Sequence, residues 1–151
     1  MKSNEIALTS IITALYVGLI EIFHPISFEV IQVRVANALL GVVPVFGWPA
    51  IVGVTLGVFI GNITSPLGPI DLLSAIPTFI GCYIIYKLKS TSVLLGLTTY
   101  TLILSLWVGY ILWYVLGLPY IITVAYLFIG IGISTIFLGY IVYKALRRVI
   151  K

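Results

Sequence analysis

The sequence predicts an all-α membrane protein with six transmembrane helices, arranged as a single domain over residues 1–151. Apolar residues make up 62% of the chain, charged residues only 8%, and the mean hydropathy is +1.26. A soluble domain carries about a quarter charged residues, so this chain has too few charges to cover its surface in water. The composition therefore excludes a soluble globule and indicates that most of the surface faces lipid.

Six apolar segments are separated by proline, glycine or charged residues. We expect helices at residues 4–24, 28–45, 48–64, 69–88, 91–116 and 119–146. The second and third are barely long enough for a hydrocarbon layer about 30 Å thick, and Pro44 to Pro49 between them predicts a tight hairpin turn. No A-x-A cleavage pattern precedes His24, so we expect the first segment to be a membrane helix and not a cleaved signal.

The basic residues set the expected orientation, because Lys and Arg in short loops stay on the cytoplasmic side during insertion. With both termini in the cytoplasm, every basic residue except Arg34 lies on that side: Lys2, Lys87, Lys89, Lys144, Arg147, Arg148 and Lys151. The net charge of +4 is spread thinly over this topology. We therefore expect a multi-pass protein of the cell membrane with no nucleic-acid partner.

In this orientation, polar residues of four consecutive helices fall in the outer half of the membrane or in its outer loops. They are Glu21, His24, Glu29, Gln32, Arg34, Asn62 and Asp71. An unpaired ion at mid-bilayer costs at least ~2.5 kcal/mol, so such residues face the bundle interior, a partner charge or water. The default hypothesis is a polar pocket open to the outside.

Arg34 is the deepest of these charges, and Asn37 follows on the same face of the second expected helix, in a stripe with Val30 and Gly41. A guanidinium offers a planar fork of donors for a carbonyl, a carboxylate or a heteroaromatic ring, and Asn37 adds a donor and an acceptor. Two interpretations stay open for Arg34. It recognises a ligand, or it pairs with Asp71 or Glu29 to hold helices together.

Three further positions are candidates for the pocket. Asn62 lies near the outer end of the third helix, and Asp71 lies in the first turn of the fourth. A helix start also favours an anion, so ligand contact and capping are both open for Asp71. Trp113 belongs to an aromatic stretch beside the expected mouth and could stack on a flat ligand, although such aromatics also form interfacial belts.

Motifs for catalysis and energy coupling are missing from the sequence. There is no Walker A pattern and no H-E-x-x-H motif. The single histidine, His24, and the single cysteine, Cys82, provide no metal-ligand set, and Cys82 is interpreted as a packing residue. We expect neither an enzyme nor a bound metal or cofactor, but a passive binder, a channel or one subunit of a larger machine.

Small residues recur at four-residue spacing in two of the expected helices. They are Ser10, Ala14 and Gly18 in the first, and Gly53, Gly57 and Gly61 in the third. Such faces permit close helix approach. We expect the glycines to serve packing within the chain, whereas the first-helix face fits an internal neighbour and a separate subunit equally well.

Several motifs in the first half of the chain resemble those of a known family. The stretch PISFEVIQVRVANAL over Pro25–Leu39 resembles the QueT family, together with the motifs Val43–Phe46, Pro49–Gly53, Gly61-Asn62, Leu67-Gly68 and Asp71. Members of this family are membrane substrate-binding subunits, or S-components, of energy-coupling factor transporters. The resemblance implies a six-helix S-component fold that captures a queuosine precursor, a 7-deazaguanine, from outside. It also implies docking onto a transmembrane coupling subunit driven by two ATPases, with Ser10, Ala14 and Gly18 as the docking face.

The resemblance extends to the candidate site residues Gln32, Arg34, Asn62 and Asp71, which match the family pattern. A guanine-like base would suit them, since a carboxylate accepts from ring N–H groups and an arginine donates to the ring carbonyl. The family usually has acidic residues where this chain has Asn37, Ile111 and Ile133. These departures make a neutral relative, such as a cyano-deazaguanine, or another vitamin-like heterocycle an alternative to an aminomethyl substrate.

Two readings from other classes stay open beside solute capture. One is a self-sufficient small channel or secondary carrier that uses Arg34 and Asp71 as a gating pair. The other is a purely structural assembly subunit, which predicts no ligand pocket.

Overall fold

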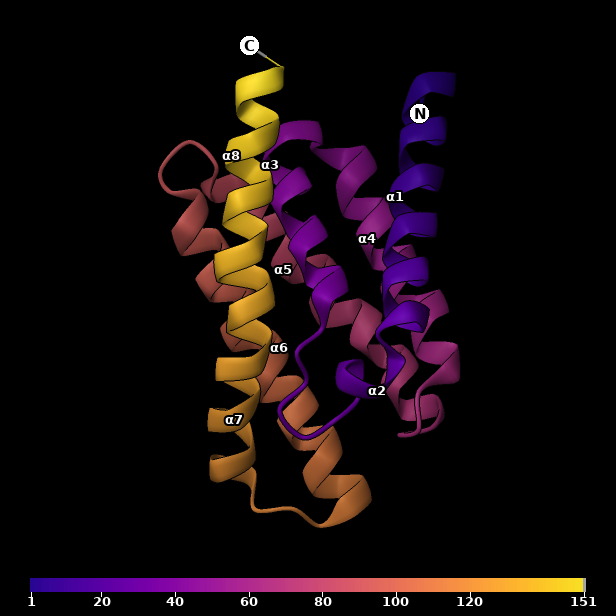
Figure 1. Cartoon of the computed structure of the whole chain (residues 1–151), viewed down its shortest axis with the longest axis vertical. Coiled ribbons are helices and arrows are strands. Elements are labelled where there is room, and N and C mark those ends of the chain that lie inside the picture. The colour runs from indigo at the N-terminus through magenta and orange to yellow at the C-terminus, as the bar shows by residue number, and fades with distance from the viewer. Residues whose placement is uncertain (151) are drawn as a thin grey trace.

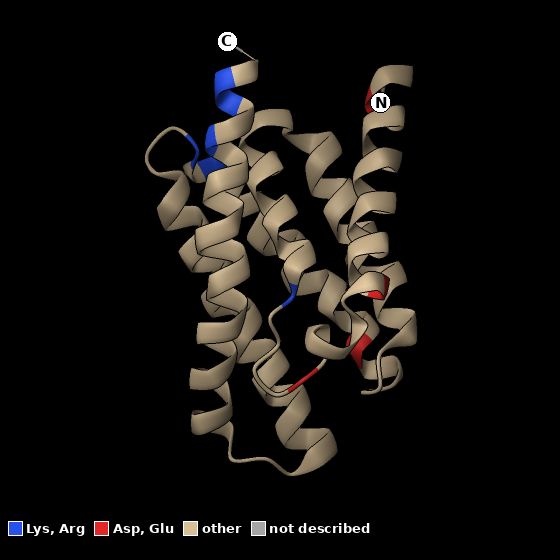
Figure 2. Cartoon of the chain, in the orientation of Figure 1, with Lys and Arg blue, Asp and Glu red and all other residues tan. Residues whose placement is uncertain are grey.

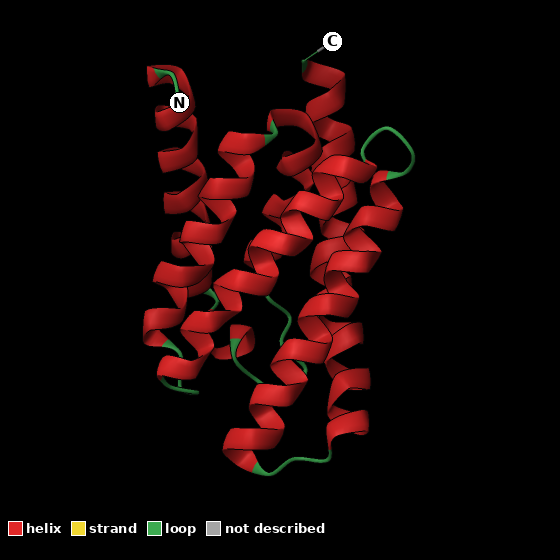
Figure 3. Cartoon of the chain, turned by 180° about the vertical axis from the view of Figure 1, so that it is seen from behind, coloured by secondary structure: helices red, strands yellow, loops and turns green. Residues whose placement is uncertain are grey.

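The computed structural model describes residues 1–150, and these form helices joined by short turns and loops, with no strand among them (Figure 3). The elements in chain order are α1 (Ser3–Ile22), α2 (His24–Ser27), η1 (Val35–Val42), α3 (Val43–Phe46), α4 (Trp48–Gly61), η2 (Asn62–Thr64), η3 (Pro69–Ser74), α5 (Ala75–Leu88), α6 (Val93–Leu116), α7 (Tyr120–Gly132), η4 (Ile133–Leu138) and α8 (Gly139–Val149). The all-helical prediction is confirmed for the described residues.

Four of the helical stretches are long and apolar enough to cross a membrane: Ser3–Ile22, Pro69–Leu88, Val93–Leu116 and Tyr120–Val149. They correspond to the first, fourth, fifth and sixth expected helices. Two shorter apolar stretches, Val35–Phe46 and Trp48–Thr64, correspond to the second and third. The last long stretch is continuous, because η4 is a π-helical segment that joins α7 to α8 without a break.

The second expected helix is wrong over residues 28–34, which form an irregular loop between α2 and η1. Gln32 has a φ of +37°, and the Arg34 N–H bonds the Gln32 carbonyl at 2.9 Å instead of a carbonyl one helical turn earlier. Since η1 begins only at Val35, Val30 does not share a helix face with Asn37 or Gly41. In Figure 1 this loop is the purple trace that runs from α2 to η1.

The turn between the two short helical stretches is formed as predicted. It centres on Gly47, whose φ of +64° disfavours any residue with a side chain. Pro49 follows in the first turn of α4, where its missing N–H leaves no helix hydrogen bond unmade. This turn sets α3 against the start of α4 (Figure 1).

The α1–α4 seam is the most extensive helix pairing among the described residues, and it is defined by three glycines of α4. Gly53, Gly57 and Gly61 pack against Ile12, Tyr16 and Ile20 of α1, one glycine for each side chain. Two α1 hydroxyls add hydrogen bonds to α4 carbonyls, from Thr9 to Pro49 at 3.2 Å and from Thr13 to Gly53 at 3.0 Å. The prediction that these glycines serve packing within the chain is confirmed.

The last helical stretch packs closely over the irregular loop and η1. Gly130 of α7 leaves no room for a Cβ because the Ile31 carbonyl lies against it, and Gly41 of η1 meets the Gly139 carbonyl in the same way. Backbone therefore touches backbone at two points on this side of the bundle. The loop is held in place by α7, and the end of η1 is held in place by α8.

Charge is distributed unevenly along the bundle. Figure 2 shows Lys and Arg gathered around the end of α8 and the α5–α6 connection. Helix α1 begins at this same end of the bundle, and α8 ends there (Figure 1). Three of the lysines lie over tyrosine rings, Lys89 on Tyr86 at 4.1 Å being the shortest. Arg34 is remote from this basic end and stands where the loop enters η1.

Candidate substrate-binding site

Five of the residues that the sequence singles out are buried polar side chains with at most 1% exposure: Gln32, Arg34, Asn37, Asn62 and Asp71. They come from the 28–34 loop, η1, η2 and η3. All of these are irregular or short 3₁₀ segments and not the centres of long helices. Burying uncompensated polar groups is costly, so the arrangement calls for a partner that satisfies them.

Arg34 has no hydrogen-bond acceptor among the described residues at its Nε, Nη1 or Nη2 atoms. Its guanidinium lies 5.3 Å from the centre of the Phe28 ring, a cation–π contact on one side only. The ion pair with Asp71 or Glu29 that the sequence left open is not formed, because an acceptor on either carboxylate would partner these atoms. For the same reason, Arg34 and Asp71 do not form the ion pair that the gating hypothesis requires.

Asp71 is engaged by the chain itself. Its two carboxylate oxygens accept from the Ser65 hydroxyl at 2.7 Å and the Ser74 hydroxyl at 2.8 Å. Its backbone carbonyl accepts from the Asn62 Nδ2 at 2.9 Å, and the Trp107 indole N–H donates to the Ser74 hydroxyl at 2.9 Å. Asp71 therefore organises the connection between α4 and α5, whichever ligand contacts it makes in addition.

Asn62 is fixed by that hydrogen bond in a defined orientation. Only its amide nitrogen can donate to the Asp71 carbonyl, so the Oδ1 atom is the one that remains, buried and without a partner. A buried acceptor of this kind needs a donor from elsewhere.

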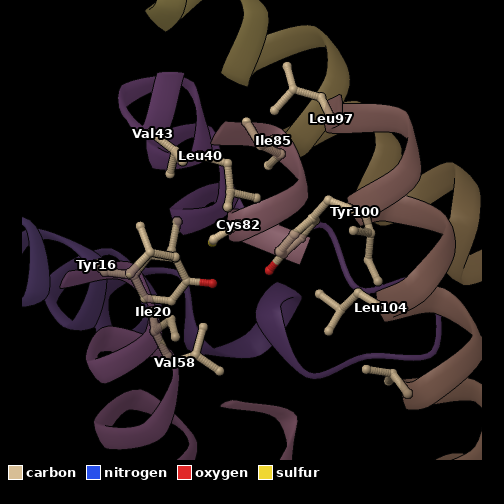
Figure 4. Close-up of a cluster of buried hydrophobic side chains, with 14 of the residues drawn as sticks. Tyr16, Ile20, Leu40, Val43, Val58, Cys82, Ile85, Leu97, Tyr100 and Leu104 are labelled. Atoms are coloured by element: carbon tan, nitrogen blue, oxygen red, sulfur yellow. The ribbon is translucent and has the colours of Figure 1, made fainter. Parts of the chain in front are cut away.

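Asn37 bonds the Tyr16 hydroxyl of α1 through its Oδ1 at 2.5 Å, while its Nδ2 is buried and unpartnered. Figure 4 shows the Tyr16 and Tyr100 hydroxyls pointing toward one another, with Cys82 beside them. The Asn37 backbone N–H donates to the Arg34 carbonyl at 2.8 Å, so Asn37 connects Arg34 to the Tyr16 hydroxyl. Tyr16, Tyr100 and Asn37 thus belong to the same polar centre as Arg34.

The sequence reasoning missed five members of this centre: Tyr16, Tyr100, Trp107, Ser65 and Ser74. A signal was present for some of them. Tyr16 and Tyr100 stand inside long apolar helices, away from the span ends where tyrosines form belts. Ser65 and Ser74 bracket Asp71 in an otherwise apolar stretch, and a buried carboxylate needs donors.

Trp113 and the three small residues of α1 are not brought to this centre. Trp113 is 48% exposed and lies in an external aromatic row, with its ring centre 5.9 Å from that of Tyr110 and the two ring planes tilted by 40°. Ile111 is buried in the core, and Ile133 on η4 is half exposed. The tryptophan that α6 does bring to the polar centre is Trp107, whose indole N–H donates to the Ser74 hydroxyl.

Ser10, Ala14 and Gly18 lie on the outer side of α1, in a shallow groove of about 600 Å³. The groove is lined by these residues and by Thr9, Thr13, Val17, Leu56 and Ile60. No atom comes within 4 Å of a Cβ built on Gly18, unlike the glycines of the α1–α4 seam. This face of α1 is therefore not used for packing within the chain.

The described residues hold no group of three His, Cys, Asp or Glu side chains that could ligate a metal. The His24 ring bonds the Thr64 carbonyl at 3.1 Å and ties α2 to η2. Cys82 is fully buried in the core (Figure 4). The positions of His24 and Cys82 are thus explained by contacts within the fold.

Comparisons with known proteins give one match. No curated protein and no solved structure matches the chain. The chain does match the family described as QueT transporter over residues 6–148, which is nearly its whole length. Together with the four long apolar helices, this match identifies a membrane protein of a transporter class. The chain belongs to the QueT transporter family.

Proposed function

We propose that this protein is the substrate-capture subunit of an energy-coupling factor importer and binds a queuosine precursor or a related 7-deazaguanine from outside. The observation that carries the proposal is the set of buried side chains with unmet hydrogen-bonding capacity: Gln32, Arg34, Asn37 and Asn62. A purely structural subunit has no use for such a set, because each unmet group destabilises the fold by about 1–3 kcal/mol. A polar ligand would satisfy them.

The direction of capture follows from the charge distribution. Basic residues gather at the end where α1 begins and α8 ends, which is the side retained in the cytoplasm under the positive-inside rule. The polar centre lies toward the opposite end, together with the 28–34 loop and the η2–η3 connection (Figure 1). We infer that the ligand enters from that end. We infer six membrane crossings with both termini inside, the two short stretches crossing as a pair joined at Gly47.

A guanine-like ring carries both hydrogen-bond acceptors and donors, which complement the unmet donors and the unmet acceptor of this centre. Arg34 can donate to both lone pairs of a ring carbonyl oxygen, and the Asn62 Oδ1 can accept from a ring N–H or an exocyclic amine. Phe28 and Tyr16 provide aromatic surface near Arg34. This complementarity supports a flat heterocycle with adjacent donors and acceptors.

The groove on α1 supports docking onto a separate transmembrane subunit. Small residues at four-residue spacing allow close approach of a foreign helix, and here they are turned away from the chain's own core. The chain has no phosphate-binding loop of its own. Energy would then come from two ATPases bound to that coupling subunit.

The ligand assignment is tested by thermal unfolding of the purified protein with and without 7-deazaguanines. A ligand that binds only the folded state stabilises it by about 2.7 kcal/mol at one hundred times its Kd. We expect this stabilisation for the wild type and for Lys144→Gln, a charge removal at the far end of the bundle, but not for Arg34→Gln. The substrate assignment is wrong if no 7-deazaguanine stabilises the wild type at saturation.

The partner assignment is tested by uptake into liposomes that hold the chain alone or with its coupling complex. A capture subunit binds ligand by itself but accumulates it only with the complex and ATP. Uptake by the chain alone would instead support the channel or carrier reading.

A further inference from the structure

The unmet groups of the polar centre are unequal in kind, and this difference carries information on the ligand's charge. Donors dominate: the guanidinium of Arg34 presents all of its N–H groups, and the amide nitrogens of Gln32 and Asn37 add more. The only side-chain amide oxygen without a partner among the buried atoms is the Asn62 Oδ1. We infer that the substrate presents a negative or strongly polarised acceptor to Arg34 and carries no cationic arm. This inference rests on the proposed function and narrows it to one class of 7-deazaguanine.

The guanidinium of Arg34 forms no ion pair inside the centre. Asp71 is the one buried carboxylate among the described residues, and both of its oxygens already accept from Ser65 and Ser74. The Glu21 carboxylate is exposed and accepts from Thr64, and Glu29 is exposed in the loop. A ligand that enters therefore meets a guanidinium whose donors are all free, whereas the Asp71 carboxylate is already hydrogen-bonded by two serines.

The positive charge that Arg34 presents to a ligand does not depend on how the amide groups are oriented. Rotating the Asn37 amide would let its nitrogen donate to the Tyr16 hydroxyl and would leave its oxygen unmet. The guanidinium has no such freedom, since it has no acceptor atom in any orientation. Arg34 alone determines the sign of the charge that a ligand meets. The orientation of the Asn62 amide is set by its hydrogen bond to the Asp71 carbonyl.

The consequence concerns the substituent on the ring. An aminomethyl group is an ammonium at neutral pH, and it would be buried near a guanidinium without a free carboxylate to pair with. A carboxyl group would supply the anion that Arg34 lacks, with bidentate geometry available. A nitrile is neutral and accepts a hydrogen bond without a charge penalty. We therefore expect carboxy- and cyano-substituted ligands to bind better than the aminomethyl one.

The test compares three ligands that share the 7-deazaguanine ring and differ in the charge of the substituent: carboxy, cyano and aminomethyl. Calorimetric titration of the purified protein gives a Kd for each. We expect the aminomethyl ligand to bind at least about tenfold more weakly than either of the others, which is the effect of one unbalanced charge contact. Asn37→Asp, an isosteric change that adds a carboxylate near Arg34 and can still accept from Tyr16, should shrink this gap by at least about threefold.

The outcomes separate this inference from the proposed function. Aminomethyl binding equal to or tighter than that of the other two ligands overturns the inference and leaves 7-deazaguanine capture intact. If none of the three binds, the proposed function fails, and mass spectrometry of the compound carried through purification then decides the charge. A neutral or anionic compound supports the inference, and a cationic one overturns it. The wild-type series is sufficient if Asn37→Asp does not fold.

Discussion

The α1–α4 seam and the segment from the 28–34 loop to η1 are both buried, but they use their polar groups in opposite ways. In the seam, glycines bring two helices into contact, and the hydroxyls of Thr9 and Thr13 find carbonyl partners. In the other segment, Gln32, Arg34 and Asn37 are buried with unmet donors. The difference indicates that the seam stabilises the fold, whereas the irregular segment carries buried polar groups that cost stability, as the proposed ligand-binding role requires.

The largest expected effect breaks the seam. A Cβ on Gly57 would lie 2.6 Å from the Cβ of Tyr16, an atom that cannot move without the α1 backbone. Gly57→Leu should therefore lower the free energy of unfolding by about 3 kcal/mol or more, the upper range for overpacking. Thermal unfolding in detergent measures it. Gly18→Leu is the matched control, since open space surrounds Gly18. Equal stability of the two variants would contradict the assignment of the seam.

The second prediction concerns the segment from the 28–34 loop to η1, where we expect a substitution to raise the free energy of unfolding. Arg34→Met removes a buried charge without an ion partner and keeps most of the side-chain volume. We expect the ligand-free protein to become more stable by about 1–3 kcal/mol, since apolar replacement of a buried charge is often stabilising. Thermal unfolding without ligand measures the gain, and loss of ligand-induced stabilisation accompanies it. Lys144→Met, at an exposed site over Tyr140, should change stability by no more than about 0.5 kcal/mol. Destabilisation by Arg34→Met would mean that Arg34 serves the fold.

The same contrast explains how much could be predicted from the sequence. Long apolar stretches and the Gly47 turn follow from hydropathy and local residue chemistry, and the structure has them. Residues 28–34 are also apolar and β-branched in part, but periodicity does not separate a helix from an extended strip in so short a run. Gln32 has a positive φ although it is not a glycine, so its residue type does not indicate this backbone conformation. The contact between Ile31 and Gly130 joins residues far apart in the chain, and local sequence does not predict it.

The candidate site was predicted in composition but not in its connections. Charge and amide groups in an apolar chain are conspicuous, so Gln32, Arg34, Asn37 and Asn62 could be named. Their partners could not, because helix rotation decides which tyrosine or tryptophan faces inward. Trp113 is exposed on the same helix that turns Trp107 toward Ser74. Six residues of helix separate them, which turns their side chains about 120° apart around the axis, and the sequence does not show which of the two directions faces inward.

A third prediction concerns the serine that links Asp71 to α6. Ser74→Ala leaves one Asp71 oxygen without its hydroxyl donor and the Trp107 N–H without its acceptor. We expect a loss of about 1–2 kcal/mol in the free energy of unfolding, from two buried groups left unpaired. Ser105→Ala is the matched control, because that buried hydroxyl only bonds back to the Thr101 carbonyl of its own helix. If the two variants lose equal stability, the link between Asp71 and α6 has no special role.

The smallest expected effect on stability tests the outer side of α1, where neither packing nor ligand binding is at stake. Ala14→Leu places a larger apolar side chain in the exposed groove beside Gly18. The free energy of unfolding should change by no more than about 0.5 kcal/mol, and the ligand Kd should stay the same. Co-purification with the coupling complex, and ATP-driven uptake with it, should be lost because the added bulk prevents close helix approach. Leu15→Ile, an exposed change of shape without added volume on the same helix, should keep both. Normal complex formation by Ala14→Leu would show that the partner docks elsewhere and that this small-residue face is only lipid-exposed.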